Sequence, residues 1–283
     1  MFSFFSKAFD PASNLKKVLK GYELPSFPAV VMEILRKLRD PNSSYSQIAA
    51  SFSLDPGLSV KLLRMANSPA FCPVKRIDNI TQAIALVGLS QLESLVISVG
   101  IARNIPRKRC NSLNPSDFWL VSAQRAMIAD EVAKRICPAR ESECFTGAFL
   151  QDMALPFLAC QRVEDYEPIL SRWAKDGGNL ADIERQSLKW DHAEVASWIC
   201  DLWQLPENIA AGIRGHHGSE VNGHEILPPV RIAALLRTPD KDGGITDIFD
   251  ACLLLGINET EVNAIFESAL KRASSLAGLI ASV

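Results

Sequence analysis

Apolar positions recur with helical spacing along almost the whole chain, and the stretches 115–136 and 227–236 show this spacing clearly. No run alternates strictly between apolar and polar residues for long enough to predict a strand. The pattern therefore predicts an all-α fold.

Capping patterns mark where several helices begin. Asp55 before Pro56 predicts a helix from Pro56 to about Asn67, because a first-turn proline lacks only an N–H that would stay unpaired there. Gly88 and Gly256 follow apolar runs and are predicted to be left-handed helix caps. Three capping boxes predict further helix starts. They are Ser90 with Glu93 before a helix over 91–102, Asp191 with Glu194 before 192–203, and Asn258 with Glu261 before 259–280.

The longest apolar stretch, from Ile80 to Ala102, has the length of a membrane span. Glu93 and several polar neighbours interrupt it, so we expect two buried helices and no membrane span. Residues 1–20 contain several phenylalanines but no signal-peptide pattern, and are expected to form a tail with a short helix.

Composition and charge restrict the functional classes. A hydrophobic content of 48% over 283 residues is enough for one large core or two modest ones. The net charge of -2 argues against nucleic-acid binding through a chain-wide field. The seven scattered cysteines form no CxxC pair, so neither a disulfide framework nor a zinc ribbon is indicated. Such cysteines are typical of a reducing compartment, and a cytoplasmic protein is expected.

Prolines, asparagines and basic residues replace the apolar pattern around 104–115. We therefore predict an N-terminal lobe over 21–105, a linker over 106–114 and a C-terminal lobe over 115–283. The cluster of Arg103, Arg107, Lys108 and Arg109 could bind a phosphate or an acidic partner. A solvated linker with helix-terminal cations is preferred, because no aromatic residues are interleaved with the charges.

Short motifs follow one another in the first half of the chain. They are Leu24-Pro25-Ser26-Phe27-Pro28, Asp55-Pro56-Gly57-Leu58, Leu62-Leu63-Arg64-Met65-Ala66-Asn67-Ser68 and the helix 80–89. The series resembles the HDOD family, the HD-related output domains of bacterial signalling proteins. The resemblance continues through Phe118-Trp119, the segment 147–153, Asp191-His192 and His216-His217. It implies a two-lobe helical architecture with a C-terminal lobe similar to the helical bundle of HD phosphohydrolases.

The resemblance also implies where metal ligands would stand. HD phosphohydrolases hold metal through a helix histidine, a His-Asp dipeptide and a later aspartate. This chain has Val121 or a neighbour at the first position, Gln151-Asp152 at the dipeptide and Ala233-Ala234 at the last. One of the four expected ligands remains, so neither a metal nor another cofactor is expected.

All four histidines, His192, His216, His217 and His224, lie in the last third of the chain. His192 and His216 are interpreted as polar groups at helix ends that satisfy buried carbonyls. His217 and His224 stand beside glycines and are expected to be exposed loop residues. The candidates for polar or ligand contacts in a relic cleft are Asp152, Gln151, His192, His216 and Arg214.

Three hypotheses about function follow from the resemblance and the missing ligands. The first is a non-catalytic regulatory module that acts in signal transduction by associating with a signalling protein. The second is a sensor that binds a cyclic dinucleotide or another phosphorylated ligand, with Arg214 near His216 as a candidate contact. The third is a residual phosphohydrolase, which would need a metal held by Asp152, His192, His216 and an unidentified fourth group.

Overall fold

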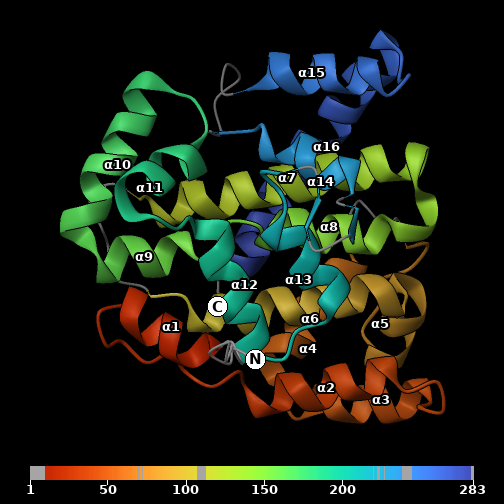
Figure 1. Ribbon diagram of the computed structural model, residues 1–283. Helices are drawn as coiled ribbons and strands as arrows, with labels where there is room; N and C mark the ends of the chain where they lie inside the picture. The colour runs from red at the N-terminus through yellow and green to blue at the C-terminus, as the bar shows by residue number, and fades with distance from the viewer. Residues whose placement is uncertain are drawn as a thin grey trace, which may run out of the picture.

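The computed structural model describes residues 10–68, 71, 73–106, 113–218, 220–221, 224–225, 227–237 and 244–281, and the chain is almost entirely helical (Figure 1). The first helices are α1 (Pro11–Val18), α2 (Ala29–Arg39), α3 (Tyr45–Ser53), α4 (Pro56–Ala66), α5 (Ile80–Val87) and α6 (Leu89–Asn104). They lie in the lower part of Figure 1. Helix α4 matches the predicted helix that begins at Pro56.

The second half of the chain continues the helical pattern and adds one small hairpin. Its helices are α7 (Pro115–Ile136), the short 3-10 helix η1 (Pro138–Arg140), α8 (Glu141–Leu150), α9 (Leu155–Gln161), α10 (Val163–Asp176), α11 (Leu180–Leu188), α12 (His192–Leu202), α13 (Glu207–Arg214), α14 (Pro228–Ala234), α15 (Ile245–Leu254) and α16 (Glu259–Ala281). Strands β1 (Glu220–Val221) and β2 (His224–Glu225) pair antiparallel between α13 and α14. The predicted all-α fold class is confirmed.

Most of the predicted caps are present. Asp191 accepts a hydrogen bond from the Glu194 amide at 2.8 Å, and Asn258 and Glu261 cap each other. Gly88 has a positive φ of 84°, but its ψ of 152° lies outside the left-handed helical region, so the predicted left-handed cap is wrong there. The cap predicted at Ser90 is wrong, because Gly88 turns the chain directly from α5 into α6 and the new helix already begins at Leu89.

The motifs of the first half hold the N-terminal helices to the rest of the molecule. Trp203, at the end of α12, donates its indole N–H to the Pro25 carbonyl at 3.0 Å and packs against Phe27 with ring centroids 5.3 Å apart. Phe27 also lies against Gly100 of α6, where an added Cβ would stand 2.5 Å from the Phe27 ring. Phe27 therefore requires a glycine at this point of α6.

Two polar residues of these motifs stabilise local turns. Asn67 ties the end of α4 to the following loop, since its side chain exchanges hydrogen bonds with both backbone groups of Ile77 at 2.7 and 2.8 Å. Asp55 caps α4 and forms an ion pair with Arg103. The prediction of a solvated cation is therefore wrong for Arg103, which is held by Asp55. Arg107, Lys108 and Arg109 lie outside the described residues.

Helix α7 runs through the middle of the molecule and packs against α8, α14 and α16. Its first turn begins at Pro115 as the sequence predicts, and most of its residues are buried. Packing crosses the predicted lobe boundary, because α6 contacts α8 and α1 contacts α12. The predicted linker falls largely on undescribed residues, so the two-lobe division stays a prediction.

The apolar stretch from Ile80 to Ala102 forms two largely buried helices, as predicted. Of the described helices, none is by itself long and apolar enough to cross a membrane. Helices α5 and α6 reach the length and composition only together, and they meet at an angle of 109°.

Candidate functional site

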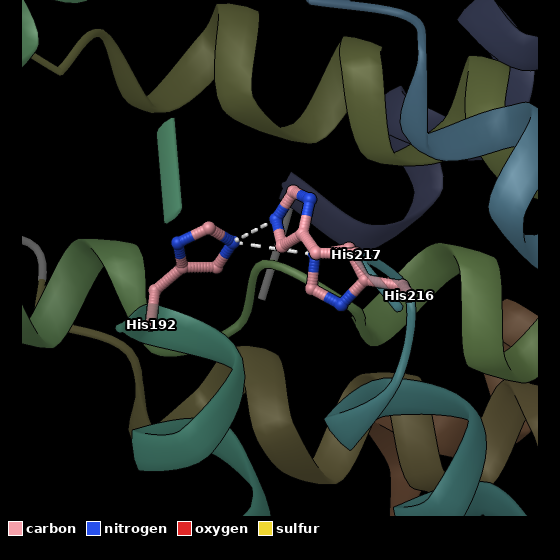
Figure 2. Close-up of side chains that lie close together, drawn as sticks. All are labelled: His192, His216 and His217. Carbon is pink, nitrogen blue, oxygen red and sulfur yellow. Dashed lines mark hydrogen bonds between the residues drawn. The ribbon is translucent and has the colours of Figure 1, made fainter. Parts of the chain in front are cut away.

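Three histidine rings converge between α7, α12 and the turn that follows α13 (Figure 2). His192 is the first residue of α12, and His216 and His217 follow directly after α13. The His192 Nε2 atom lies 3.2 Å from His216 Nε2 and 3.0 Å from His217 Nε2. The rings are therefore close enough for their Nε2 atoms to share one cation.

Asp152 brings a carboxylate to the same point. It follows α8, and its Oδ1 atom lies 3.2 Å from His192 Nε2 and 3.3 Å from His216 Nε2. His192 and His216 are almost completely buried, and Asp152 is 8% exposed. The structure thus brings together three of the predicted residues, and adds His217 to them.

The outer nitrogens of two rings are held by further groups. His192 Nδ1 lies 2.6 Å from Glu184 Oε2, and His216 Nδ1 lies 2.6 Å from the Ile213 carbonyl. A ring nitrogen that faces an acceptor carries the proton, so both contacts turn an Nε2 atom toward the shared point. The interpretation of His216 as a partner of a buried carbonyl is confirmed, whereas His192 is held by a carboxylate.

Glu184 is a buried carboxylate that the sequence analysis missed. It is fully buried on α11, and besides the His192 ring it accepts hydrogen bonds from the His192 amide at 2.8 Å and the Tyr166 hydroxyl at 2.5 Å. Helix α11 carries no recognisable motif, and only the fold places Glu184 behind His192. The one sequence signal for a contact between them was that Glu184 lies eight residues before His192.

Arg125 of α7 supplies the positive charge of the site. The residue is 4% exposed, and its guanidinium forms an ion pair with Asp152 Oδ2 and donates to the Leu236 carbonyl at 2.6 and 2.9 Å. Arg125 follows Val121 by one helical turn, on the helix where the family resemblance implied a ligand histidine. This buried cation therefore pairs with the Asp152 oxygen that the two histidines do not contact.

These contacts shift the pKa values of the cluster in different directions. Burial opposes charge on Asp152, but Arg125 and the two histidines hold the pKa of its carboxyl well below the usual range. Burial also opposes charge on His192, but Glu184 and Asp152 outweigh it and raise its pKa to about 10, so a metal ion that binds its Nε2 atom must displace a proton. Burial and the neighbouring histidines lower the pKa of His217. Near neutral pH, His217 is thus neutral and has a lone pair to offer.

The cluster lies at the base of a pocket of about 550 Å³. Arg125, Arg231 and Arg237 line it together with apolar side chains of α14 and α15. Arg237 pairs with Asp247 at 3.1 Å, while exposed Arg231 has no ion-pair partner among the described residues. Two arginines at the mouth and a buried cluster at the base suit an anionic ligand such as a phosphate.

Several sequence predictions need correction or placement here. Arg214 does not line the pocket, because it turns toward Glu207 and Asp201 at 3.5 and 4.0 Å. His217 is half-buried within the cluster and is no exposed loop residue.

Gln151 is buried beside Asp152 but lies outside the pocket lining, and its amide has no partner in the described part of the chain. His224 lies in β2, and its side chain is outside the described residues.

The chain is similar to known proteins in sequence. The HDOD domain family model matches residues 24–219, which is more than half of the chain. A protein of Treponema pallidum (strain Nichols), itself uncharacterised, is 27% identical over 224 residues, which are 75% of this chain and 41% of that protein. The chain thus spans less than half the length of this relative.

Solved structures share the fold at low identity. An HDOD domain protein of unknown function from Geobacter sulfurreducens is 21% identical with a TM-score of 0.71, covering 94% of this chain and 97% of its own. A protein of Shewanella amazonensis SB2B, provisionally described as a phosphohydrolase, has the same identity and TM-score and covers 95% and 98%. A Marinobacter aquaeolei VT8 protein provisionally assigned to signal transduction is 17% identical with a TM-score of 0.69, covering 94% and 61%.

The fold and the motifs define a helical module related to the HD phosphohydrolases. The chain belongs to the HDOD family.

Proposed function

We propose that this chain is a non-catalytic signalling module that binds a divalent metal ion in its histidine pocket and acts by associating with a signalling protein. The observation that carries the proposal is that donor atoms of His216, His217 and Asp152 all lie 3.0–3.2 Å from His192 Nε2. The proposed metal departs from the sequence expectation of none. The hypothesis of a metal held by Asp152, His192 and His216 lacked a fourth group, and His217 lies beside them at 3.0 Å from His192 Nε2.

The donor set fits a metal in chemistry and in spacing. Three imidazoles and a carboxylate are ligands that zinc accepts, and at bond lengths of about 2.0–2.1 Å two ligands of a tetrahedral ion stand roughly 3.3 Å apart. Donor atoms of His216, His217 and Asp152 lie 3.0–3.2 Å from His192 Nε2, and His216 Nε2 lies 3.3 Å from Asp152 Oδ1. These distances fall near the tetrahedral value. Glu184 and the Ile213 carbonyl orient two rings from behind, as outer partners do in zinc sites.

The same geometry favours binding over hydrolysis. Catalytic zinc sites keep a coordination position open for water, whereas four protein donors fill a tetrahedral ion. The second oxygen of Asp152 is engaged by Arg125, so it is not free to hold a further ion. The bound metal would supply a fixed positive charge and would hold α8, α12 and the turn after α13 together.

Metal analysis with matched variants tests this proposal. Purified protein should carry about one equivalent of zinc, and competition with a chromophoric chelator should show at least about tenfold weaker binding for His217→Ala and Asp152→Asn. Exposed Asp182 offers the control, and Asp182→Asn should leave affinity unchanged. Absence of bound zinc would refute the metal centre. Phosphodiesterase turnover with zinc or manganese, lost in Asp152→Asn, would refute the non-catalytic assignment.

A phosphorylated ligand is a second candidate, supported by Arg231 at the mouth of the pocket. Calorimetry with cyclic di-GMP should then show saturable binding that Arg231→Ala weakens at least about tenfold, since charge-assisted phosphate contacts are strong. Arg214→Ala is the matched control, because Arg214 lies outside the pocket. No heat at high ligand concentration would count against the nucleotide-sensing function and leave the metal centre untouched.

A further inference from the structure

A second, larger cavity lies between α16 and the helices α4, α6, α7 and α8. Its volume is about 1150 Å³, and it shares no lining residue with the histidine pocket. Helices from both predicted lobes line it, so a bound molecule would touch both. A cavity of this size accommodates a drug-sized organic ligand.

A row of serines on α6 faces this cavity. Ser90, Ser94 and Ser98 follow one another at four-residue spacing and therefore lie on one face of the helix. Ser94 Oγ is hydrogen-bonded to Thr146 at 2.5 Å and to Ser142 at 3.2 Å. Ser98 is 2% exposed, and its hydroxyl has no partner among the described residues. A buried hydroxyl without a partner costs free energy, and a ligand in the cavity can supply the missing hydrogen bond.

The rest of the lining combines apolar walls with a charged rim. The apolar side chains are Met65, Phe71, Leu95, Met127, Phe145, Leu276 and Ile280. Asp130 is compensated by Lys134 at 2.8 Å and Arg272 at 3.3 Å. The Nε atom of Arg272 is buried and unpaired within the described part of the chain, a second donor without an acceptor.

Exposed charges at the rim favour an anionic head group. Arg64 and Lys271 line the cavity, and neither forms a salt bridge with another described residue. Glu267 is the one exposed carboxylate of the described lining, so it offsets only one of these two cations. Asp130 and the partly buried Glu141 face Lys134, so among the exposed groups of the lining two cations stand against one carboxylate.

We propose that this cavity is a ligand site for an amphipathic organic anion. Its apolar body lies against Met127 and Phe145, a carbonyl or hydroxyl group bonds to Ser98, and its carboxylate or sulfonate lies at the rim that carries Arg64 and Lys271. Helix α8 lines this cavity at its beginning and leads to Asp152 at its end. A ligand here is thus connected to the histidine pocket by one helix.

Isothermal titration calorimetry with anilinonaphthalene sulfonate tests the site. This probe has an apolar aromatic body and one sulfonate, and one equivalent should bind to the full chain with saturation. Ser275→Trp places a bulky ring on the exposed cavity side of α16 and should weaken binding at least about tenfold. Ser274→Trp is the matched control, since Ser274 is also exposed but does not line the cavity, and binding should be unchanged.

Two further variants test the recognition chemistry. Lys271→Glu should weaken binding of the sulfonate about fivefold or more, with little effect on uncharged phenylnaphthylamine. Ser98→Ala should weaken binding about fivefold, which corresponds to one neutral hydrogen bond. Absence of saturable binding to the wild type would refute the site, as would equal losses in the two tryptophan variants. Equal loss for the charged and uncharged probes would refute the anionic head group.

Discussion

The histidine pocket and the large cavity beside α16 bury polar groups in opposite ways. In the histidine pocket, Asp152, Glu184 and Arg125 all have charged or hydrogen-bonding partners, and donor atoms of His216, His217 and Asp152 lie 3.0–3.2 Å from His192 Nε2. In the cavity, Ser98 and the Nε atom of Arg272 have no partner among described residues, and the walls are mainly apolar.

This difference indicates what each site can bind. A dense, fully paired network fixes side chains in one geometry, as a small ion requires. An apolar cavity with few unpaired polar atoms suits a larger organic molecule, which supplies its own surface and hydrogen-bonding groups. The two sites therefore differ in ligand class as well as in position.

The largest expected difference comes from removing one paired arginine in each region. Arg125→Met removes the ion-pair partner of Asp152 Oδ2 and the donors to the Leu236 carbonyl, and should lower the free energy of unfolding by about 3–5 kcal/mol. Arg272→Met, at the partly exposed rim of the cavity, should cost about 1 kcal/mol. Urea unfolding curves measure both values. Similar losses would mean that the histidine network is no more tightly paired than the cavity rim.

Metal binding should stabilise only the histidine region. Free zinc at 100 times its dissociation constant should raise the free energy of unfolding by about 2.7 kcal/mol, and excess chelator should reverse the gain. The measurement is thermal unfolding followed by circular dichroism, with and without zinc. His217→Ala should lose the gain, and Ser98→Ala should keep it. A gain that survives in His217→Ala would show that zinc binds elsewhere.

Two serines on α6 provide a smaller, matched contrast within the cavity. Ser94→Ala removes a partner of Thr146 and Ser142 and should cost about 1–2 kcal/mol. Ser98→Ala removes an unpaired buried hydroxyl and should be neutral or stabilise by up to about 1 kcal/mol. Chemical denaturation of both variants in the same buffer gives the comparison. Equal losses would mean that Ser98 has a partner after all.

The smallest effect concerns Glu141, which also lines the cavity. Burial and the neighbouring Asp130 raise the pKa of Glu141 from 4.5 to about 7. The folded state therefore holds this proton more tightly, and the wild type loses stability as pH rises through this window. Glu141→Gln should stabilise by roughly 0.5–1 kcal/mol at pH 8 after solvent screening, and not at all near pH 4. Unfolding measured at both pH values tests this, and a gain at low pH would contradict it.

Much of the helical architecture could be predicted from the sequence because its determinants are local. The starts at Pro56 and Asp191 depend on a cap and a few following residues, and the structure confirms both. The helix start predicted at Ser90 was wrong, because the chain turns at Gly88 and α6 begins at Leu89, before the capping motif. The positions of Asp152, His192 and His216 could be marked in advance through the family resemblance.

The rest of the candidate site could not be read from local patterns. Arg125 and Glu184 are separated by 59 residues along the chain and meet Asp152 and His192 only through packing of α7, α8, α11 and α12. His217 was placed in an exposed loop because its glycine neighbour suggested one. The turn after α13 instead folds it inward onto His192.

The sequence by itself determined that this chain is helical, where many helices begin, and that it resembles the HDOD family, because periodicity, caps and motifs act over a few residues. Tertiary structure alone decided that three histidines and one aspartate share a point, that Arg125 and Glu184 support them, and that a separate cavity opens beside α16. Such sites depend on distances between side chains far apart along the chain. Those distances exist only once the helices have packed.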